Sequence, residues 1–351
     1  MNETFAGQWE QRWHPLRREW IVYSAHRNTR PWKGMGVDRS QDSPAYDPGC
    51  YLCPGNKRAQ GKRNPKYSGV YIFDNDFPVV GETAPYVSSQ VPHGHPALFK
   101  KSRAYGIARV VCYDPRHNVT LAQIDSDKVA DVFIHWREQM AEFRKTPGIH
   151  FVLIFENRGE LVGVSNPHPH SQIYATNFPF SLVGNALRAG EEFKQEYGKN
   201  LFDEILAFEQ NTGVRIIADN AHACAFVPFF ARYAYEVMIF PKKRHATLIT
   251  MNEDELYDLA VVFQEVIQRY DALYGMPFPY VMSFLQAPVD GGDYGDYHFH
   301  MLLQPPLRAP GLKKFLAGPE IGGGNFMADT MPEEKARELQ QVNIQPIKEE
   351  F

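Results

Sequence analysis

The 351-residue sequence has little net charge, few cysteines and no long apolar run. Its net charge of −4 provides no basic excess to hold a nucleic acid nonspecifically. Four cysteines are too few for a disulfide framework in a chain of this length. No apolar run approaches the roughly 20 residues that span a bilayer, and the N-terminus lacks the apolar centre of a signal peptide. We therefore expect a cytoplasmic protein with neither a nucleic acid nor a membrane as its partner.

Two of the four cysteines lie at C-x-x-C spacing, in "DPGCYLCPGN". Cys50 and Cys53 on a Pro/Gly turn are typical of a metal-binding knuckle, and a tetrahedral site needs two further N or S ligands. His117 in "DPRHN" and one histidine of "HPH" are the candidates. A redox pair is the alternative, but Pro54 and Gly55 follow at once, where a thioredoxin-like motif would begin a helix. The pattern therefore favours a metal site.

The segment "GVSNPHPHSQIYAT" places His168 and His170 on either side of a proline. On extended backbone, residues i and i+2 face the same way, so one imidazole can bind the metal while the other lies close by and stays free. A free, neutral imidazole is a competent nucleophile towards phosphorus. Ser165 and Gln172 offer neutral donors to phosphoryl oxygens, and Gly163 permits close backbone approach. The alternatives are that both histidines bind the metal, or that His170 is a core residue.

An internal duplication is indicated by features that recur in the same order. "AYGIARVVCYDPRHNVTLAQIDSDKVADVF" and "RYAYEVMIFPKKRHATLITMNEDELYDLAV" each read as a strand, basic residues with a histidine, an acidic cap and an amphipathic helix. A strand, a loop and a His-x-His pair follow in both copies. We predict an α+β fold in which two units, roughly residues 20–180 and 210–305, share one largely antiparallel sheet flanked by helices. Residues 1–351 then form a single domain, with a C-terminal segment at about 306–351.

Several strings resemble the galactose-1-phosphate uridylyltransferase family of the histidine-triad superfamily: "SAHRNTRPWKG", "CYLCPGN", "YIFDNDFP", "FENRGELVGVSNPHPHSQIYA" and "KKFLAGPE". The resemblance runs from about residue 14 to the C-terminal helix, and it implies two fused histidine-triad-like units. It also implies that His170 is the nucleophile that becomes uridylylated. The metal ligands that it implies are Cys50, Cys53, His117 and His168 around one structural zinc.

The resemblance assigns further residues to the substrates. Arg27 and Arg30 correspond to arginines near the phosphates, and Asn75 and Asp76 to partners of the ribose hydroxyls. The residues implied around the uracil are Leu52, Phe73, Phe77, Val110 and Asn157. Those implied at the phosphates are Gly163, Val164, Ser165 and Gln172. Lys314, Phe315 and Glu320 correspond to a late segment that touches phosphate and hexose, partly across a homodimer with shared active sites.

The sequence departs from this family at a second metal site, which many bacterial members build from three histidines and a glutamate. His298 and His300 match two of the histidines, but the third position falls on Leu285. The stretch "FPFSLVGNALRAG", where the glutamate should lie, has no acid before Glu191. Two imidazoles are a poor stand-alone site for a divalent ion, so we predict that this second site is absent. The glycine-rich stretch "GPEIGGGNFMADT" also differs from many members in the hexose segment.

The predicted function is exchange of UMP between UDP-glucose and galactose 1-phosphate by a ping-pong route through a uridylyl-histidine. A nucleoside-diphosphate-sugar phosphorylase of the same superfamily, with inorganic phosphate as acceptor, is the alternative. Pro169 argues against it, because those relatives tend to have serine between the two histidines. A zinc-stabilised binding module without catalysis explains the C-x-x-C pair but not the donors around His170.

Overall fold

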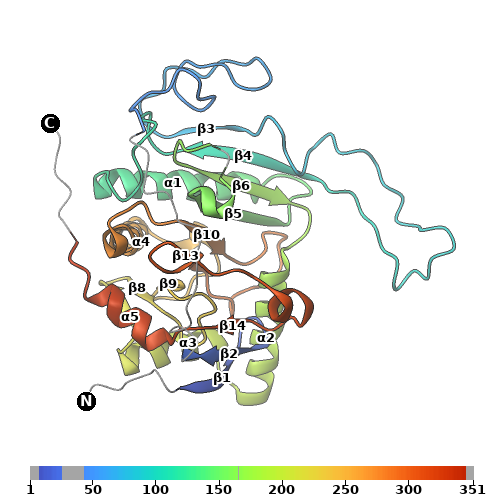
Figure 1. Ribbon diagram of the computed structural model, residues 1–351. Coiled ribbons are helices and arrows are strands. Elements are labelled where there is room, and N and C mark those ends of the chain that lie inside the picture. Colours follow the sequence, from blue (N-terminus) through green and yellow to red (C-terminus); the bar gives the residue numbers. More distant parts are fainter. Residues whose placement is uncertain (1–7, 26–42, 165, 345–351) are drawn as a thin grey trace.

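A nine-stranded antiparallel sheet runs through the molecule, in the order β3-β4-β6-β5-β10-β11-β9-β8-β7 (Figure 1). The computed structural model describes residues 8–25, 43–164 and 166–344. The strands of the first half are β3 (Tyr71–Asp74), β4 (Gly106–Cys112), β5 (Phe151–Arg158) and β6 (His170–Thr176). Those of the second half are β7 (Ile216–Asp219), β8 (Ala223–Phe226), β9 (Val237–Pro241), β10 (Tyr280–Leu285) and β11 (His300–Gln304). The predicted fold class is confirmed.

The two halves of the sheet repeat one arrangement. In the first half β4 is followed by helix α1 (Ser126–Phe143), β5 and β6; in the second half β9 is followed by α4 (Glu253–Tyr274), β10 and β11. The spatial orders β4-β6-β5 and β9-β11-β10 are mirror-ordered about the β5–β10 pair. Each His-x-His pair therefore stands at the start of the equivalent strand, β6 or β11. The residue bounds of the two units stay a prediction.

Helices α1 and α4 pack on one face of the sheet and form the larger core with it. Apolar side chains recur along α1 at helical spacing and are buried: Val129, Val132, Phe133, Trp136, Met140 and Phe143. Asp125 is the N-cap residue, although its side chain makes no capping hydrogen bond. Asn252 and Glu255 form a reciprocal capping box at the start of α4, which satisfies backbone donors that would otherwise lack partners.

The opposite face carries the rest of the chain. Over the second half, α2 (Ser181–Tyr197), α3 (Leu201–Thr212) and a three-stranded sheet of β1 (Trp9–His14), β2 (Glu19–Ser24) and β14 (Met327–Ala328) form a second core. Over the first half, the cysteine loop packs on β3 and β4. The C-terminal part adds the hairpin β12 (Leu307–Ala309) and β13 (Leu312–Lys313), and helix α5 (Pro332–Gln340). This opposite face is the one onto which His170 and Gln172 project.

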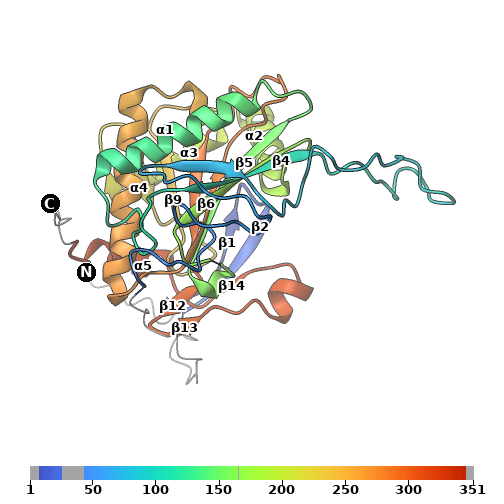
Figure 2. The same ribbon diagram turned by 90° about the horizontal axis from the view of Figure 1, so that it is seen from above.

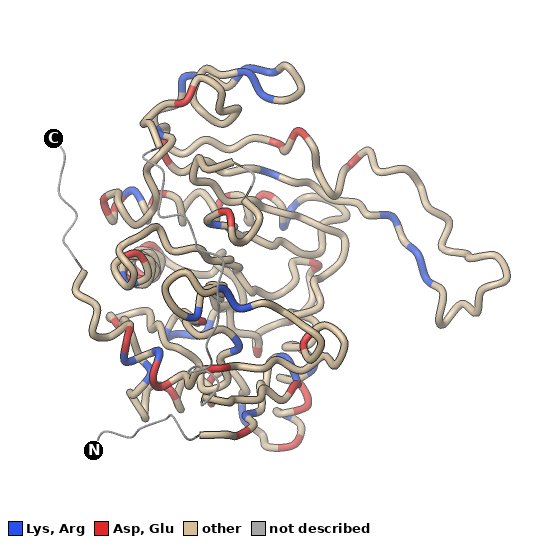
Figure 3. The backbone as a smooth tube through the Cα atoms, viewed as in Figure 1, with Lys and Arg blue, Asp and Glu red and all other residues tan. Residues whose placement is uncertain are grey.

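The connection between β3 and β4, residues 75–105, leaves the body of the molecule as a long arm (Figures 1 and 2). We call it the β3–β4 arm. Its exposed large apolar side chains are Phe77, Val79, Tyr86, Leu98 and Phe99. Over the molecule as a whole, basic and acidic residues are interspersed along the backbone (Figure 3). None of the helices within the described ranges is both long and apolar enough to cross a membrane.

Candidate active site

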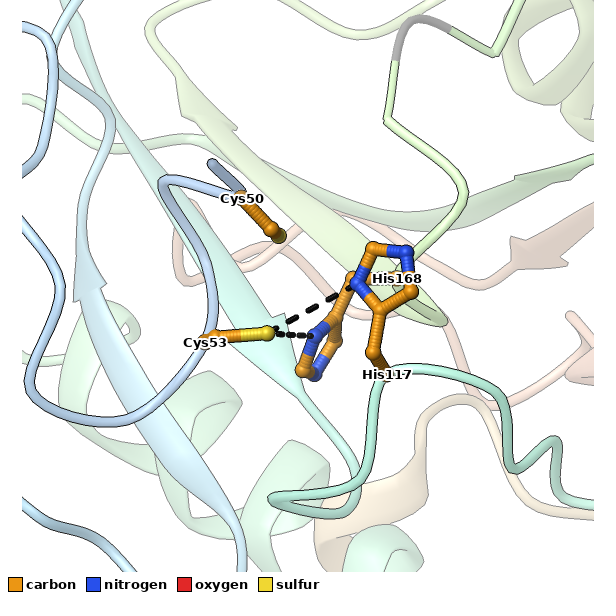
Figure 4. Close-up of side chains that lie close together, drawn as sticks. All are labelled: Cys50, Cys53, His117 and His168. Carbon is orange, nitrogen blue, oxygen red and sulfur yellow. Dashed lines mark hydrogen bonds between the residues drawn. The ribbon is translucent and has the colours of Figure 1, made fainter. Parts of the chain in front are cut away.

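Cys50, Cys53, His117 and His168 point towards one another beside the start of β6 (Figure 4). One ligand atom from each residue lies within 4.8 Å of all the others, and all four residues are buried. The Cys53 Sγ is 3.6 Å from the Nδ1 of His117 and 3.5 Å from the Nδ1 of His168. The structure thus brings together the four residues that the sequence predicts as metal ligands.

The ring of His168 is oriented for metal binding by a backbone group. Its Nε2 lies 3.0 Å from the carbonyl oxygen of Asp114. A carbonyl only accepts, so Nε2 carries the proton and the lone pair of Nδ1 points at the cysteines. Burial lowers the pKa of His168 to about 4, which keeps the ring neutral as a ligand must be.

Cys50 is held by donors that suit a thiolate. The backbone N–H of Leu52 and the side-chain amide of Asn166 donate to its Sγ, at 3.3 and 3.5 Å. Burial raises the pKa of the neighbouring Cys53 to about 11, a cost that a bound dication offsets. Two sulfurs and two imidazole nitrogens within tetrahedral reach fit zinc by size and softness. Sequence reasoning missed Asn166, which also accepts the backbone N–H of His168 at 2.9 Å.

His170 is oriented differently from His168, although the two lie on the same short segment. The Nδ1–H of His170 donates to the carbonyl oxygen of His168 at 2.8 Å. This bond fixes the tautomer, so the lone pair is on Nε2, away from the cysteines. Burial lowers the pKa of His170 below its ordinary value, which keeps the free base populated at neutral pH. The residue is only half-buried and lines an open cavity.

The strands next to β6 assemble several predicted nucleotide contacts on the His170 face. Phe73 on β3 pairs with Val110 on β4, and Val110 pairs with Gln172 on β6. Phe73 and Val110 pack in one cluster with Leu52 from the cysteine loop. The Asn75 side-chain amide lies 3.4 Å from the Oε1 of Gln172. Several predicted uracil, ribose and phosphate contacts therefore lie next to one another on the strands beside His170.

His170 also lines a cavity of about 370 Å³. Asn157, Val164, His170 and His117 are among the residues that line it. Gly163 ends the short 3₁₀ turn η3 (Glu160–Val162) with a φ of 82°, a left-handed conformation that favours glycine. Arg27, Arg30 and Ser165 lie outside the described residues.

For other predicted contacts, the described residues show no interaction with His170. The Phe77 side chain is 73% exposed, at the base of the β3–β4 arm. The Lys314 ammonium donates to Glu320 at 2.6 Å and to the Met327 carbonyl at 2.7 Å. The side chain of Phe315 is exposed. Among the described residues, no hydrogen bond or ion pair joins Lys314, Phe315 or Glu320 to His170.

The second His-x-His pair repeats the geometry of the first but is sealed from solvent. The Nδ1–H of His300 donates to the carbonyl of His298 at 3.0 Å, and Leu285 stands opposite His300 in the β10–β11 register. The Phe240 ring stacks on that of His300 at 4.8 Å between centroids. Burial lowers the pKa of His298 to about 3 and that of His300 to about 4, so both rings stay neutral.

One buried acid lining the cavity was also missed by sequence reasoning. Glu156 is 4% exposed and accepts the hydroxyl of Tyr280 at 3.0 Å. Burial raises its pKa to about 7. Its place in the "FEN" string, next to Asn157, could have marked it as a candidate site residue. Because side chains alternate between the two faces of β5, however, Glu156 lies on the buried face of that strand.

Comparisons with known proteins agree over nearly the whole chain. The family model for the galactose-1-phosphate uridyl transferase N-terminal domain matches residues 2–179, and the model for the C-terminal domain matches residues 186–350. The galactose-1-phosphate uridylyltransferase of Haemophilus influenzae is 34% identical over 341 residues, covering 97% of this chain and 96% of that relative.

Solved structures share the fold. One described as a uridylyltransferase has a TM-score of 0.76 at 28% identity, covering 94% of this chain and 97% of the other. The structure of an ADP-glucose phosphorylase from Arabidopsis thaliana has a TM-score of 0.74 at 20% identity, covering 96% of this chain and 100% of the other. At that identity the likeness concerns the fold alone.

Proposed function

Because the chain belongs to the galactose-1-phosphate uridylyltransferase family, we propose that it exchanges UMP between UDP-glucose and galactose 1-phosphate. The single observation that carries the mechanism is the hydrogen bond from His170 Nδ1–H to the His168 carbonyl. It leaves Nε2 as an unprotonated, unligated nucleophile at the edge of a cavity. His168 supports the metal and His170 reacts.

The exchange takes place in two displacements at phosphorus. Nε2 of His170 attacks the α-phosphorus of UDP-glucose, the bond from that phosphorus to the bridging oxygen breaks, and glucose 1-phosphate leaves. A phosphate oxygen of galactose 1-phosphate then attacks the same phosphorus, the N–P bond breaks, and UDP-galactose leaves with His170 restored. Gln172 and Ser165, with Arg27 and Arg30, stabilise charge on the phosphoryl oxygens. Asn75 and Asp76 hold the ribose, and Leu52, Phe73 and Val110 pack around the uracil.

The buried Cys2His2 cluster supports one zinc ion, held by Cys50, Cys53, His117 and His168. When bound, zinc supplies structural cross-linking between the cysteine loop and the start of β6. Each ligand position is filled by a protein atom, so the metal leaves no site for substrate. The second metal site stays a predicted absence, since Leu285 provides no ligand opposite His300.

A second copy of this chain completes the site. The β3–β4 arm exposes apolar side chains and extends away from the body of its own protomer, which supports their burial against a partner (Figure 2). Lys314, Phe315 and Glu320 make no described contact with His170 of their own chain, which supports their serving the partner's site. All four cysteines are buried and free, which supports a reducing compartment such as the cytoplasm.

The decisive experiment uses UDP-glucose labelled in its α-phosphate, incubated with the protein alone. We expect acid-labile label on His170, released as UDP-galactose when galactose 1-phosphate is added. Absence of label, or an undiminished exchange rate in His170→Ala, would eliminate the mechanism. Release by inorganic phosphate as fast as by galactose 1-phosphate would instead favour the phosphorylase. Binding of UDP-glucose without any label would favour a non-catalytic module.

A further inference from the structure

The turn from Lys57 to Arg63 follows the cysteine loop and carries a run of basic residues (Figure 3). Its backbone closes through Arg58 N–H to the Lys62 carbonyl at 2.7 Å. It is tied to the cysteine loop by Arg63, which donates to the Gly55 carbonyl at 2.7 Å. We call it the 57–63 turn. The hydrogen bond from Arg63 anchors one end of the turn to the cysteine loop.

Arg58 is the one basic residue of the 57–63 turn that faces inward. It is 8% exposed, whereas Lys57, Lys62 and Arg63 are exposed. Its guanidinium covers the ring of Phe73, 4.2 Å from the centroid, and its Nη2 is 3.4 Å from the Oδ1 of Asp76. A buried ion pair is often less stabilising than a well-packed apolar pair, so its presence here calls for a role beyond stability.

Asp76 is held from two sides by this turn. The Arg58 guanidinium lies against its carboxylate, with both side chains at least nine-tenths buried. The side-chain amide of Gln60 donates to its backbone carbonyl. Within the described ranges, Nε and Nη1 of Arg58 have no hydrogen-bond partner, so the guanidinium is not fixed by other polar groups. Oδ1 of Asp76 likewise has no hydrogen-bond partner there, so the ion pair with Arg58 is what holds this carboxylate oxygen.

We propose that Arg58 is a positioning residue for ribose recognition: it fixes the Asp76 carboxylate that binds the ribose hydroxyls, and so determines discrimination between ribose and deoxyribose nucleotides. This rests on the proposed function, which assigns Asp76 to the ribose. Arg58 acts through Asp76 and does not touch the nucleotide. A planar guanidinium that stacks and pairs at once is not replaced by an ammonium.

The experiment compares kcat/KM for UDP-glucose with that for its analogue lacking the ribose 2′-hydroxyl. We expect the unmodified enzyme to favour UDP-glucose about 10- to 100-fold, the range for a hydrogen bond to a charged group. Arg58→Met and Asp76→Asn should each bring the ratio close to one, and the double variant should be no worse than either. Arg58→Lys should give an intermediate ratio.

Lys62→Met is the matched control, because it removes the same charge from an exposed position of the same turn. It should keep the unmodified ratio. An unchanged ratio in Arg58→Met with a full metal count, or an equal fall in Lys62→Met, would overturn the inference. Calorimetric binding of UDP and 2′-deoxy-UDP gives the same comparison without turnover. Lack of uridylyl transfer by the unmodified chain would therefore refute the proposed function while Arg58 is still tested.

Discussion

The Nδ1 atom of His170 lies 2.8 Å from the carbonyl oxygen of His168, and the same bond recurs between His300 and His298 at 3.0 Å. The same hydrogen-bonded His-x-His arrangement therefore occurs at the start of β6 and at the start of β11. In the first half the ring borders a cavity, whereas in the second it is stacked under Phe240 and fully buried. Access to an electrophile, and not imidazole orientation, distinguishes the two copies.

The first prediction concerns the nucleophile. His170→Ala should lower kcat for uridylyl exchange on the order of 10⁴-fold or more, because no other group supplies the covalent step. The thermal midpoint and the metal content should stay close to those of the unmodified protein, since the His170 ring lies outside the ligand cluster. Steady-state exchange and metal analysis check this. A variant that keeps a tenth of the exchange rate would contradict it.

The second prediction concerns the metal. It compares two cysteines that are buried in the same apolar cluster, of which only Cys53 belongs to the proposed ligand set. Cys53→Ser should lose most of its zinc and unfold several degrees lower, because three ligands hold the ion far more weakly. Cys112→Ser is the control, since Cys112 is fully buried in the same cluster but is not among the four ligands. It should retain one zinc per chain by elemental analysis. Two metals per chain in the unmodified protein would refute the predicted absence of the second site.

Much of the fold could be predicted from the sequence because it rests on periodic patterns. The 3.6-residue period of α1 and the recurrence of strand, helix, strand and His-x-His specify both halves. The C-x-x-C and HPH segments likewise indicate the metal centre, since ligand types and rigid spacing limit the geometry.

What could not be predicted depends on burial and on backbone groups. Nothing in the run of basic residues after Cys53 distinguishes buried Arg58 from exposed Lys62. The orienting partner of His168 is the carbonyl of Asp114, a group that every residue carries. Phe77 is exposed because the chain leaves the sheet at the start of the β3–β4 arm. No periodic pattern of apolar residues in the sequence indicates where the chain leaves the sheet.

The third prediction uses the raised pKa of Glu156. In the folded chain this carboxyl has a pKa of about 7, against an ordinary 4.5, because of burial. Between those values the unfolded chain releases the proton and the folded chain keeps it. Stability of the unmodified protein should therefore fall as pH rises from about 4.5 to 7, by roughly 3 kcal/mol from this group.

Urea unfolding at pH 5, 6, 7 and 8 checks this, with Glu156→Gln as the variant. The free energy of unfolding of Glu156→Gln, relative to the unmodified protein, should rise through this window and level off above pH 7. Glu142→Gln is the control, because the hydrogen bond to Arg109 lowers the pKa of the Glu142 carboxyl. The free energy of unfolding of Glu142→Gln, relative to the unmodified protein, should therefore not change with pH above pH 5. A flat difference for Glu156→Gln would show that this carboxylate is charged in the fold.

The fourth prediction compares two glycines in the same backbone state. Gly163 and Gly198 have φ of 82° and 68°, and an added Cβ would meet no atom within 4 Å at either. Alanine should therefore cost about 1 kcal/mol of unfolding free energy at both, from backbone strain alone. Gly198 ends α2, away from the cavity, whereas Gly163 leads into Val164 and the segment before His168.

The activities of the two variants should then diverge. Lys313 donates to the Leu161 carbonyl at 2.7 Å and so holds the preceding η3 turn. We therefore expect strain at Gly163 to be relieved towards Val164. A shift there would displace backbone that we propose lies at the phosphates, so Gly163→Ala should lose about tenfold or more in kcat/KM, as small misplacements near reacting groups do. Gly198→Ala should keep full activity. Equal kcat/KM in the two variants would mean that the backbone at residues 163 and 164 does not approach the transferred phosphoryl group.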